Sequence, residues 1–326
     1  MTVISERFSA HNSFLYFPYL GRLSMSPASF LVCLAAAVAA AQGMTLMEEI
    51  ANAGSTTLVE LLKSTGLDKA VDSGYLTVFA PTNDAFTNLP DNLTQTITGN
   101  ATILNAVLSF HATSAIFRAQ DAVPNMLIET LLKESKIRVN VYDDNAGGSI
   151  VAVNGARVIK ADIPASNGLL HVIDRVIFPP AGSFYDLVAM SDVHKELKRI
   201  IDSVNYKSVL EGHVGTFFAP TDDAFKSFGA MLTARGVDFN GNDVATKEFI
   251  DYHMLDSVVY SIGAKTGMYN TWDHGESLGV MMNANGTAKI NQANVILGDI
   301  PATNGVMHVI DSVLIPEPYA SSIVIG

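Results

Sequence analysis

The chain has 326 residues, of which 48% are hydrophobic and 16% charged, with a formal net charge of −12. This length accommodates two ordinary domains with cores of their own, and the composition excludes intrinsic disorder. The acidic balance, without any basic cluster, gives no expectation of nucleic-acid binding. The single cysteine, Cys33, lies in the N-terminal segment that we expect to be removed, so the mature chain would have no disulfide, no thiol catalysis and no zinc–thiolate site.

The N-terminal residues 1–41 have the features of a secretory signal peptide. Phe30–Val38 is a short apolar run, and three alanines follow it as a small-residue cleavage site ending at Ala41. The run is too short for a membrane span, so we expect a secreted mature chain with no stable span. Three alternatives stay open: a true start at Met25, an uncleaved signal anchor, or an ordinary N-terminal helix.

Periodicity predicts a first unit with helices before strands. We expect helices at residues 46–53, from Thr57 onward, at 101–111 and at 127–133, and strands at 75–80 and 137–141. Residues 150–160 predict a hairpin that turns at Asn154-Gly155. Residues 90–99 are expected to form a loop.

The second unit repeats this order after a short, stiff linker, residues 180–182. Ser183 is expected to cap its first helix. Further helices are predicted at 193–204 and 247–255, partly loop structure at 230–243, and strands at 278–282, 287–290 and 295–297. The tail, residues 317–326, is too short and too weakly apolar to predict a lipid-anchor signal.

One long stretch occurs twice. Asp162–Pro179 (DIPASNGLLHVIDRVIFP) returns at Asp299–Pro316 (DIPATNGVMHVIDSVLIP), with twelve of eighteen positions identical. A self-match of this length indicates a duplicated unit, and the period is that of a whole domain.

Each copy predicts a turn followed by a buried strand. The turns are Asn167-Gly168 and Asn304-Gly305, since Asn-Gly favours tight turns, and Val- and Ile-rich runs follow them. Side chains alternate faces along a strand. His171 therefore points away from Asp174, as His308 does from Asp311, and neither pair is expected to form a catalytic dyad.

A second box confirms the duplication at the sequence level. Phe79–Phe86 (FAPTNDAF) recurs as Phe218–Phe225 (FAPTDDAF), with seven of eight positions identical. Each box predicts a strand-to-helix corner. Its threonine (Thr82, Thr221) caps the helix and its aspartate (Asp84, Asp223) lies in the first turn.

These paired boxes resemble the two sequence boxes of the fasciclin domain. The resemblance covers both copies and nearly all of the chain after residue 44. It implies an α+β fold class: two tandem domains, residues 44–179 and 183–316, each a β-wedge or sandwich of about seven strands with packed helices. It also implies an extracellular adhesion or matrix role, with no cofactor.

Within that family, an Asp-Ile pair just before the closing strand resembles an integrin-recognition motif. The matching residues are Asp162-Ile163 and Asp299-Ile300, and an exposed carboxylate could complete a metal site on a receptor. The alternative is a turn aspartate followed by a core isoleucine. A proline follows each isoleucine and restricts the backbone that would present the motif.

The family's Tyr-His motif matches Tyr252-His253, whereas the first unit has Phe110-His111 and lacks the hydroxyl. The apolar stripe of each helix places these residues toward the core, which favours a structural role over partner binding.

Two further histidines, His171 and His308, are expected to be core residues rather than metal ligands or acid–base groups, because no ligand stands at suitable spacing on the same face. We expect them to bond to the box aspartates, Asp84 and Asp223.

Three sequons, at Asn92, Asn100 and Asn285, predict surface glycosylation in a eukaryotic secreted protein. The first two are expected in a polar loop and the third at a hairpin tip.

The sequence therefore predicts a non-catalytic, metal-free adhesion or matrix protein that binds an extracellular protein receptor or a glycan. No Walker loop, dinucleotide fingerprint or HExxH zinc motif occurs. Two alternatives stay open. One is a wall protein that binds polysaccharide, favoured if Tyr269 and Trp272 are exposed. The other is a small-ligand carrier or hydrolase on the same fold, favoured by a concave pocket with convergent polar groups.

Overall fold

The structure is a computed structural model that describes residues 43–144, 147–234, 243–272, 275–283 and 286–316. The predicted signal peptide, Cys33, the sequon Asn285 and the C-terminal tail lie outside the described residues. We call residues 44–179 domain 1 and residues 183–316 domain 2.

Domain 1 contains a seven-stranded sheet with the order β2-β1-β7-β6-β5-β4-β3. Its helices are α2 (Leu46–Asn52), α3 (Thr56–Thr65), α4 (Asp68–Ser73), α5 (Asn83–Thr87), α6 (Asp91–Thr98), α7 (Ala101–Phe110) and the 3-10 turn η1 (Ala119–Asp121). Its strands are β1 (Leu76–Pro81), β2 (Ala112–Thr113), β3 (Met126–Glu129), β4 (Lys136–Asp143), β5 (Ser149–Val153), β6 (Ala156–Ala165) and β7 (Gly168–Ile173).

Domain 2 repeats this sheet with the order β10-β11-β12-β13-β14-β8-β9. Its helices are α8 (Phe184–Met190), α9 (Lys195–Ser203), α10 (Lys207–Gly212), α11 (Asp222–Ala234), α12 (Asp243–Tyr252) and the 3-10 turn η2 (Ser261–Gly263). Its strands are β8 (Gly215–Pro220), β9 (Met254–Leu255), β10 (Gly267–Asn270), β11 (Ser277–Met282), β12 (Ala288–Ile290), β13 (Ala293–Ala302) and β14 (Gly305–Ile310). The predicted α+β class with two seven-stranded units is thus confirmed.

The two duplicated boxes form the centre of each sheet. The corner-box strand β1 pairs in parallel with the closing strand β7, and every residue of both strands is buried. Strands buried on both faces are typical of parallel pairs covered by other elements. Alternate residues therefore face two cores: Val78 belongs to the cluster with the helices α2–α4, and Phe79 to the cluster with β3–β6.

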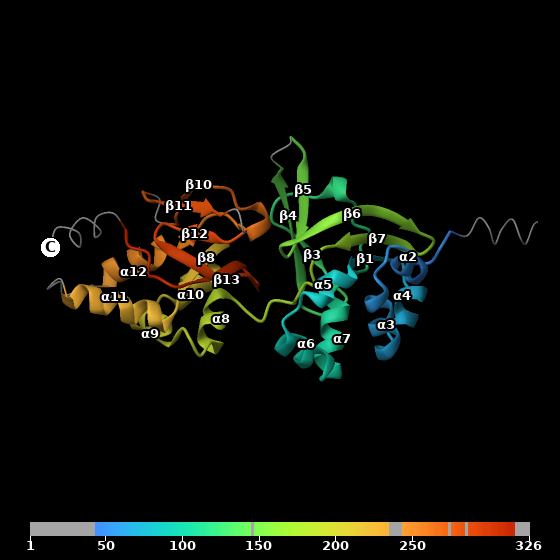
Figure 1. The fold of residues 1–326 in the computed structure, drawn as a ribbon, viewed down its shortest axis with the longest axis horizontal. Helices are drawn as coiled ribbons and strands as arrows, with labels where there is room; N and C mark the ends of the chain where they lie inside the picture. The colour runs from blue at the N-terminus through green and yellow to red at the C-terminus, as the bar shows by residue number, and fades with distance from the viewer. Residues whose placement is uncertain (1–42, 145–146, 235–242, 273–274, 284–285, 317–326) are drawn as a thin grey trace, which may run out of the picture. The chain divides into compact units, whose positions relative to one another are not determined.

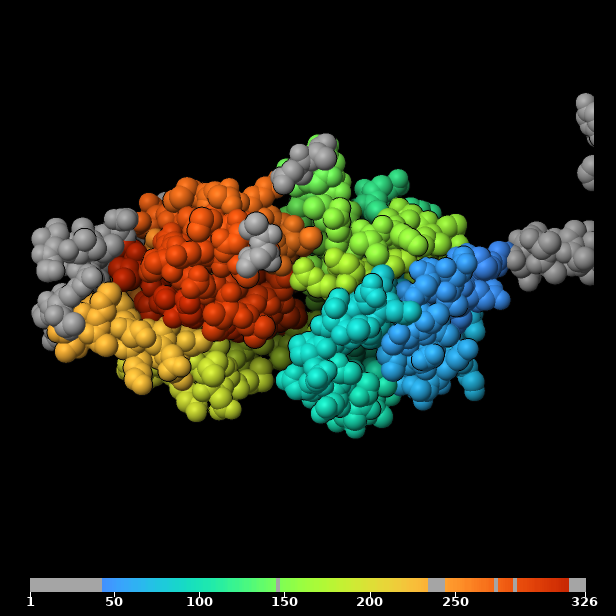
Figure 2. All heavy atoms as spheres, viewed as in Figure 1, coloured from blue at the N-terminus to red at the C-terminus, as the bar shows by residue number. Residues whose placement is uncertain are grey.

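Helices and outer strands lie in separate parts of domain 1. In Figure 1 the helices (blue to cyan) lie on one side of the central pair and the β4–β6 strands (green) on the other. The space-filling view shows the same separation on the visible face (Figure 2). Domain 2 follows the same plan, with Phe217 in the helix-side core and Phe218 in the strand-side core.

Two local predictions were wrong. Residues 127–133 were expected to be helical, but β3 occupies Met126–Glu129, where pairing with β4 overrides the local apolar spacing. Within residues 90–99, which were predicted to be a loop, Asp91–Thr98 form the helix α6, and Pro90 stands at its N-cap position. The helix α11 continues to Ala234, and residues 235–242 of the region that was predicted to be partly loop lie outside the described residues.

Candidate functional site

The Asn-Gly turn ties the start of each domain to the closing strand. In domain 1, Asn167 Oδ1 accepts a hydrogen bond from Leu46 N–H (2.8 Å), and its Nδ2 donates to the carbonyl oxygens of Val71, Asp72 and Gly74. In domain 2, the Asn304 side chain accepts from Phe184 N–H and donates to the carbonyls of Leu210 and His213. Both asparagines thus hold several backbone groups at the ends of helices.

The corner boxes are helix caps, as their sequence predicts. Thr82 Oγ1 accepts from Ala85 N–H at 3.1 Å, and Thr221 Oγ1 accepts from Ala224 N–H at 3.2 Å. The aspartates Asp84 and Asp223 are exposed in the first turns of α5 and α11. There a carboxylate interacts favourably with the helix dipole.

The histidines of the closing strands do not bond to those aspartates, so this prediction was wrong. Nδ1 of His171 accepts from the backbone N–H of Asp162 (3.3 Å), and its Nε2 lies 2.8 Å from the carbonyl oxygen of Phe117. His308 makes the same pair of contacts, with Asp299 N–H (3.2 Å) and the Val259 carbonyl (2.9 Å). Both ring nitrogens of each histidine thus bond to backbone groups of the same domain, and the corner-box aspartates are not their partners.

The two aspartates that precede the closing strands lie in β-bulges. The pairing of β6 with β7 shifts register between Lys160 and Ile163, and that of β13 with β14 shifts between Leu297 and Ile300. Inside these shifts Asp162 has φ 55° and Asp299 has φ 60°, in the left-handed region. Aspartate tolerates this region better than most residues, and a bulge re-aims the side chain it carries.

The two aspartates differ in what their carboxylates contact. Asp162 Oδ1 accepts from Ala119 N–H at 3.1 Å, and 40% of its side chain is exposed. Asp299 accepts from Ser261 N–H (2.7 Å) and from the Ser261 hydroxyl, and Arg175 Nη1 donates to its Oδ2 (2.8 Å). Only 13% of the Asp299 side chain is exposed. The residue whose backbone N–H bonds to the aspartate is an alanine (Ala119) in domain 1 and a serine (Ser261) in domain 2. This exchange distinguishes the two copies, because the serine hydroxyl adds a second hydrogen bond.

Burial and bonding also set the protonation of the domain 2 pair. Burial alone would raise the pKa of Asp299, but the nearby His308 and the Ser261 and Arg175 hydrogen bonds outweigh it and lower that pKa. The pKa of His308 is lowered because burial outweighs the attraction of Asp299. The pair is therefore a carboxylate beside a neutral imidazole at neutral pH.

The remaining candidate partner-binding residues face inward. Ile163 and Ile300 are half-buried and pack against the helix-side cores. Tyr252 and His253 are each 2% exposed. Tyr252 and His253 therefore have a structural role, whereas Ile163 and Ile300 keep part of their surface accessible.

His111 and His253 each join the end of a helix to the segment after the closing strand. Nδ1 of His253 bonds to the Phe249 carbonyl (2.8 Å), and its Nε2 accepts from Leu314 N–H (3.0 Å). In domain 1, His111 bonds in the same way to Val107 and Ile177. Burial lowers the pKa of both histidines to about 4, despite the backbone hydrogen bond that opposes the shift.

Two of the predicted sequons fall on exposed asparagines of described residues. Asn92 lies in the helix α6, and Asn100 is the N-cap of α7, where Oδ1 accepts from Thr102 and Ile103 N–H. They lie on a helix and a cap rather than in the predicted loop. A glycan on Nδ2 of Asn100 would leave that capping oxygen in place, and glycosylation remains a prediction.

The aromatic pair considered for polysaccharide binding is packed rather than displayed. Trp272 packs against the helix-side core, and its ring contacts the His213 ring edge-on with the two centroids 4.5 Å apart. The Tyr269 hydroxyl bonds to the backbone N–H and carbonyl of Lys265. Both side chains are partly buried, so they do not form the exposed aromatic pair that would favour the polysaccharide alternative.

One pentapeptide, Gly275–Gly279 (GESLG), matches the pattern of the nucleophile elbow of hydrolases. That motif places its serine at a strand-to-helix turn. Ser277 instead begins the strand β11, pairs with Asn270 of β10, and donates its hydroxyl to the Asn270 side chain. The described residues also contain no group of three or more acidic, His or Cys side chains placed to hold a metal.

These features define a class of protein with two tandem α+β domains, each of which has an aspartate in a β-bulge before its closing strand. The sequence model of the fasciclin domain matches residues 53–179 and 186–316. The chain therefore belongs to the fasciclin domain family, as the two boxes predicted.

Relatives with this domain come from distant organisms. The transforming growth factor-beta-induced protein ig-h3 of Sus scrofa is 29% identical over 75% of this chain and 35% of its own length. Human periostin is 28% identical over 81% of this chain and 31% of its own. The fasciclin-like arabinogalactan protein CTB11 of Cercospora beticola is 24% identical over 86% of this chain and 79% of its own. The chain thus spans about a third of the length of the two animal relatives.

Proposed function

We propose that the protein is a secreted, glycosylated adhesion or matrix protein that binds an extracellular protein or glycan surface and has no catalytic activity. Its family membership and the features of residues 1–41 support this proposal. No described helix is long and apolar enough to cross a membrane.

The observation that carries the proposal is the exposed carboxylate of Asp162. The left-handed backbone and the Ala119 N–H fix its position, while 40% of the side chain stays open to solvent. A fixed, exposed carboxylate loses little conformational entropy on binding and can pair with a receptor cation or a basic group. In this proposal domain 1 binds the extracellular partner through Asp162. Asp299 of domain 2 takes no part, because its carboxylate is already bonded within the protein.

An attachment assay with a charge-removing variant tests this. Asparagine tolerates the left-handed region as aspartate does, and its side-chain oxygen can still accept from Ala119, so Asp162→Asn removes only the charge. We expect fibroblast attachment to surfaces coated with Asp162→Asn to fall at least fivefold, with an unchanged thermal melt. Asp72→Asn, an equal charge change on the exposed surface of α4, should attach as the wild type does.

A wall-binding role is the second candidate, and the name of the fungal relative favours it. Retention of the wild type on an arabinogalactan gel, together with no fibroblast attachment, would support that role. Attachment that is equal for the wild type and Asp162→Asn would contradict the assignment to Asp162.

A further inference from the structure

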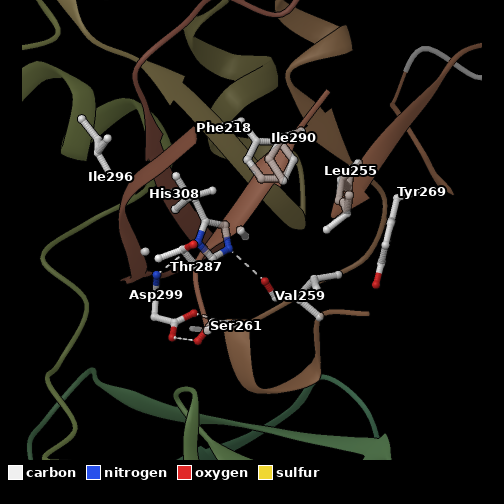
Figure 3. A pocket seen from close by; sticks show the side chains of 16 residues that line it. Phe218, Leu255, Val259, Ser261, Tyr269, Thr287, Ile290, Ile296, Asp299 and His308 are labelled. Carbon is white, nitrogen blue, oxygen red and sulfur yellow. Dashed lines mark hydrogen bonds between the residues drawn. The ribbon is translucent and has the colours of Figure 1, made fainter. Parts of the chain in front are cut away.

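Domain 2 contains a cavity of about 260 Å³ in its strand-side core. Most of its walls are apolar, and Phe218, Leu255, Val259, Tyr269, Val280 and Ile290 contribute to them. Figure 3 shows the ring of His308 among the lining side chains, with Phe218 and Ile290 above it in this view. Cavities of about 150 Å³ with aliphatic and aromatic walls bind benzene, so this one has room for a larger ring system.

The equivalent space in domain 1 is filled by a phenyl ring. Phe117 and Val259 are equivalent because each carbonyl oxygen bonds to Nε2 of the closing-strand histidine, at 2.8 and 2.9 Å. The Phe117 ring lies 5.7 Å from the ring of His171 and 6.1 Å from that of Phe79, and it is 4% exposed. Domain 2 keeps the other two rings of this group, Phe218 and His308, which are stacked with their centroids 5.7 Å apart. It lacks the third ring.

Two further positions are also smaller in domain 2. By strand register, Val151 of β5 corresponds to Ala288 of β12, and Ala161 in the bulge of β6 corresponds to Gly298 in the bulge of β13. Ala288 and Gly298 both line the cavity. Domain 2 thus has smaller side chains at three positions around this space. Three other walls carry larger side chains, because Leu255, Tyr269 and Ile290 stand where domain 1 has Thr113, Ile128 and Val153. These walls surround the place of the missing phenyl ring, where a cavity remains.

The polar atoms at the cavity wall are already bonded within the protein. Both nitrogens of His308 and both carboxylate oxygens of Asp299 have partners, as does the hydroxyl of Ser261. A charged ligand would have to break these contacts to be stabilised. An uncharged ring would pack on Phe218 and His308 and release apolar surface from water.

We infer that domain 2 binds a small, uncharged aromatic ligand in this cavity, with a ring in the place that the Phe117 side chain occupies in domain 1. The site is separate from the Asp162 surface. Domain 2 would then bind the small ligand, and domain 1 would bind the extracellular partner.

Titration with N-phenyl-1-naphthylamine, an uncharged aromatic fluorophore, tests the inference on the whole protein. We expect the wild type to bind one equivalent with enhanced fluorescence. Val259→Phe restores the domain 1 side chain and should weaken binding at least tenfold. Val123→Phe adds the same ring at an exposed position of domain 1 (55% exposed) and should leave binding unchanged.

A second variant covers the case in which Val259→Phe does not fold. Ala288→Val combined with Gly298→Ala introduces two smaller domain 1 side chains, and we expect it to weaken binding at least threefold while the thermal melt is retained. The inference is overturned if the wild type does not bind the fluorophore, or if a folded cavity variant binds it as tightly as the wild type.

Discussion

Single buried histidines make the stability of this protein sensitive to mild acid. The pKa values of His111 and His253 are about 4 in the folded protein, against about 6.5 in an unfolded chain. Between these values the unfolded chain binds protons that the folded protein does not. The folded state is therefore stabilised above pH 6.5 and loses that stability as the pH falls toward 4.

We expect the free energy of unfolding to fall by about 1.4 kcal/mol per pH unit for each histidine within this window. His253→Asn removes one of the two groups, and asparagine can still donate to the Phe249 carbonyl. The variant should be less stable at pH 7, yet its stability should depend less steeply on pH between 4 and 6.5. Urea unfolding at several pH values measures both quantities, and an unchanged slope would show that His253 does not titrate in this way.

At the scale of elements, the central parallel pair depends on one glycine in each domain. Gly168 begins β7 with φ +153°, and a Cβ atom there would lie 2.0 Å from the carbonyl oxygen of Leu76 on β1. Gly305 has the same relation to the carbonyl of Gly215. The close approach of two backbones, rather than the turn itself, requires glycine at this position.

Gly168→Ala should consequently destabilise domain 1 by more than about 3 kcal/mol, since the obstacle is backbone that cannot move without breaking the pairing. Gly212→Ala, at the end of α10 with no atom within 4 Å of the added Cβ, should be neutral or slightly stabilising. Thermal unfolding distinguishes the two variants. A Gly168→Ala protein that melts with the control would contradict the close-approach argument.

The duplicated boxes made the central elements predictable, because each carries its own local chemistry. The threonine caps at Thr82 and Thr221, the Asn-Gly turns and the buried closing strands follow from residue type and period alone. The short outer strand β3 does not, since its apolar residues fit a helix as well as a strand until β4 pairs with them. The local sequence pattern is therefore enough to predict elements with a clear period and caps, whereas a short strand such as β3 depends on the strand that pairs with it.

The candidate site was predictable only in part for the same reason. The Asp-Ile pairs are visible in the sequence, but the difference between Asp162 and Asp299 arises from Ala119 and Ser261, more than thirty residues earlier in each copy, and from Arg175, which bonds only to Asp299. Comparing the two copies position by position would have shown that substitution, and the Phe117-to-Val259 change as well. The sequence of one copy alone does not indicate which residues lie opposite one another in the folded domain.

For the whole molecule, duplication has produced two domains with the same fold and different surroundings for the same aspartate. Asp299 has a lowered pKa and accepts three hydrogen bonds from Ser261 and Arg175. Its charge therefore contributes to stability above the pKa of an unfolded aspartate, about 3.9, and that contribution is lost as the pH falls through the lower folded value. Asp162 accepts one hydrogen bond at an exposed position, where a charge contributes little to folding.

We therefore expect opposite consequences from the same change in the two domains. Asp299→Asn should lower the free energy of unfolding by about 1–3 kcal/mol at pH 7, because Arg175 and Ser261 lose a charged acceptor, and it should leave fibroblast attachment intact. Asp162→Asn should change stability by less than about 0.5 kcal/mol and reduce attachment. Urea unfolding and the attachment assay, run on both variants, measure the two effects separately. If both variants lost stability equally, the two aspartates would share one structural role, and the binding function would have to lie elsewhere on the protein.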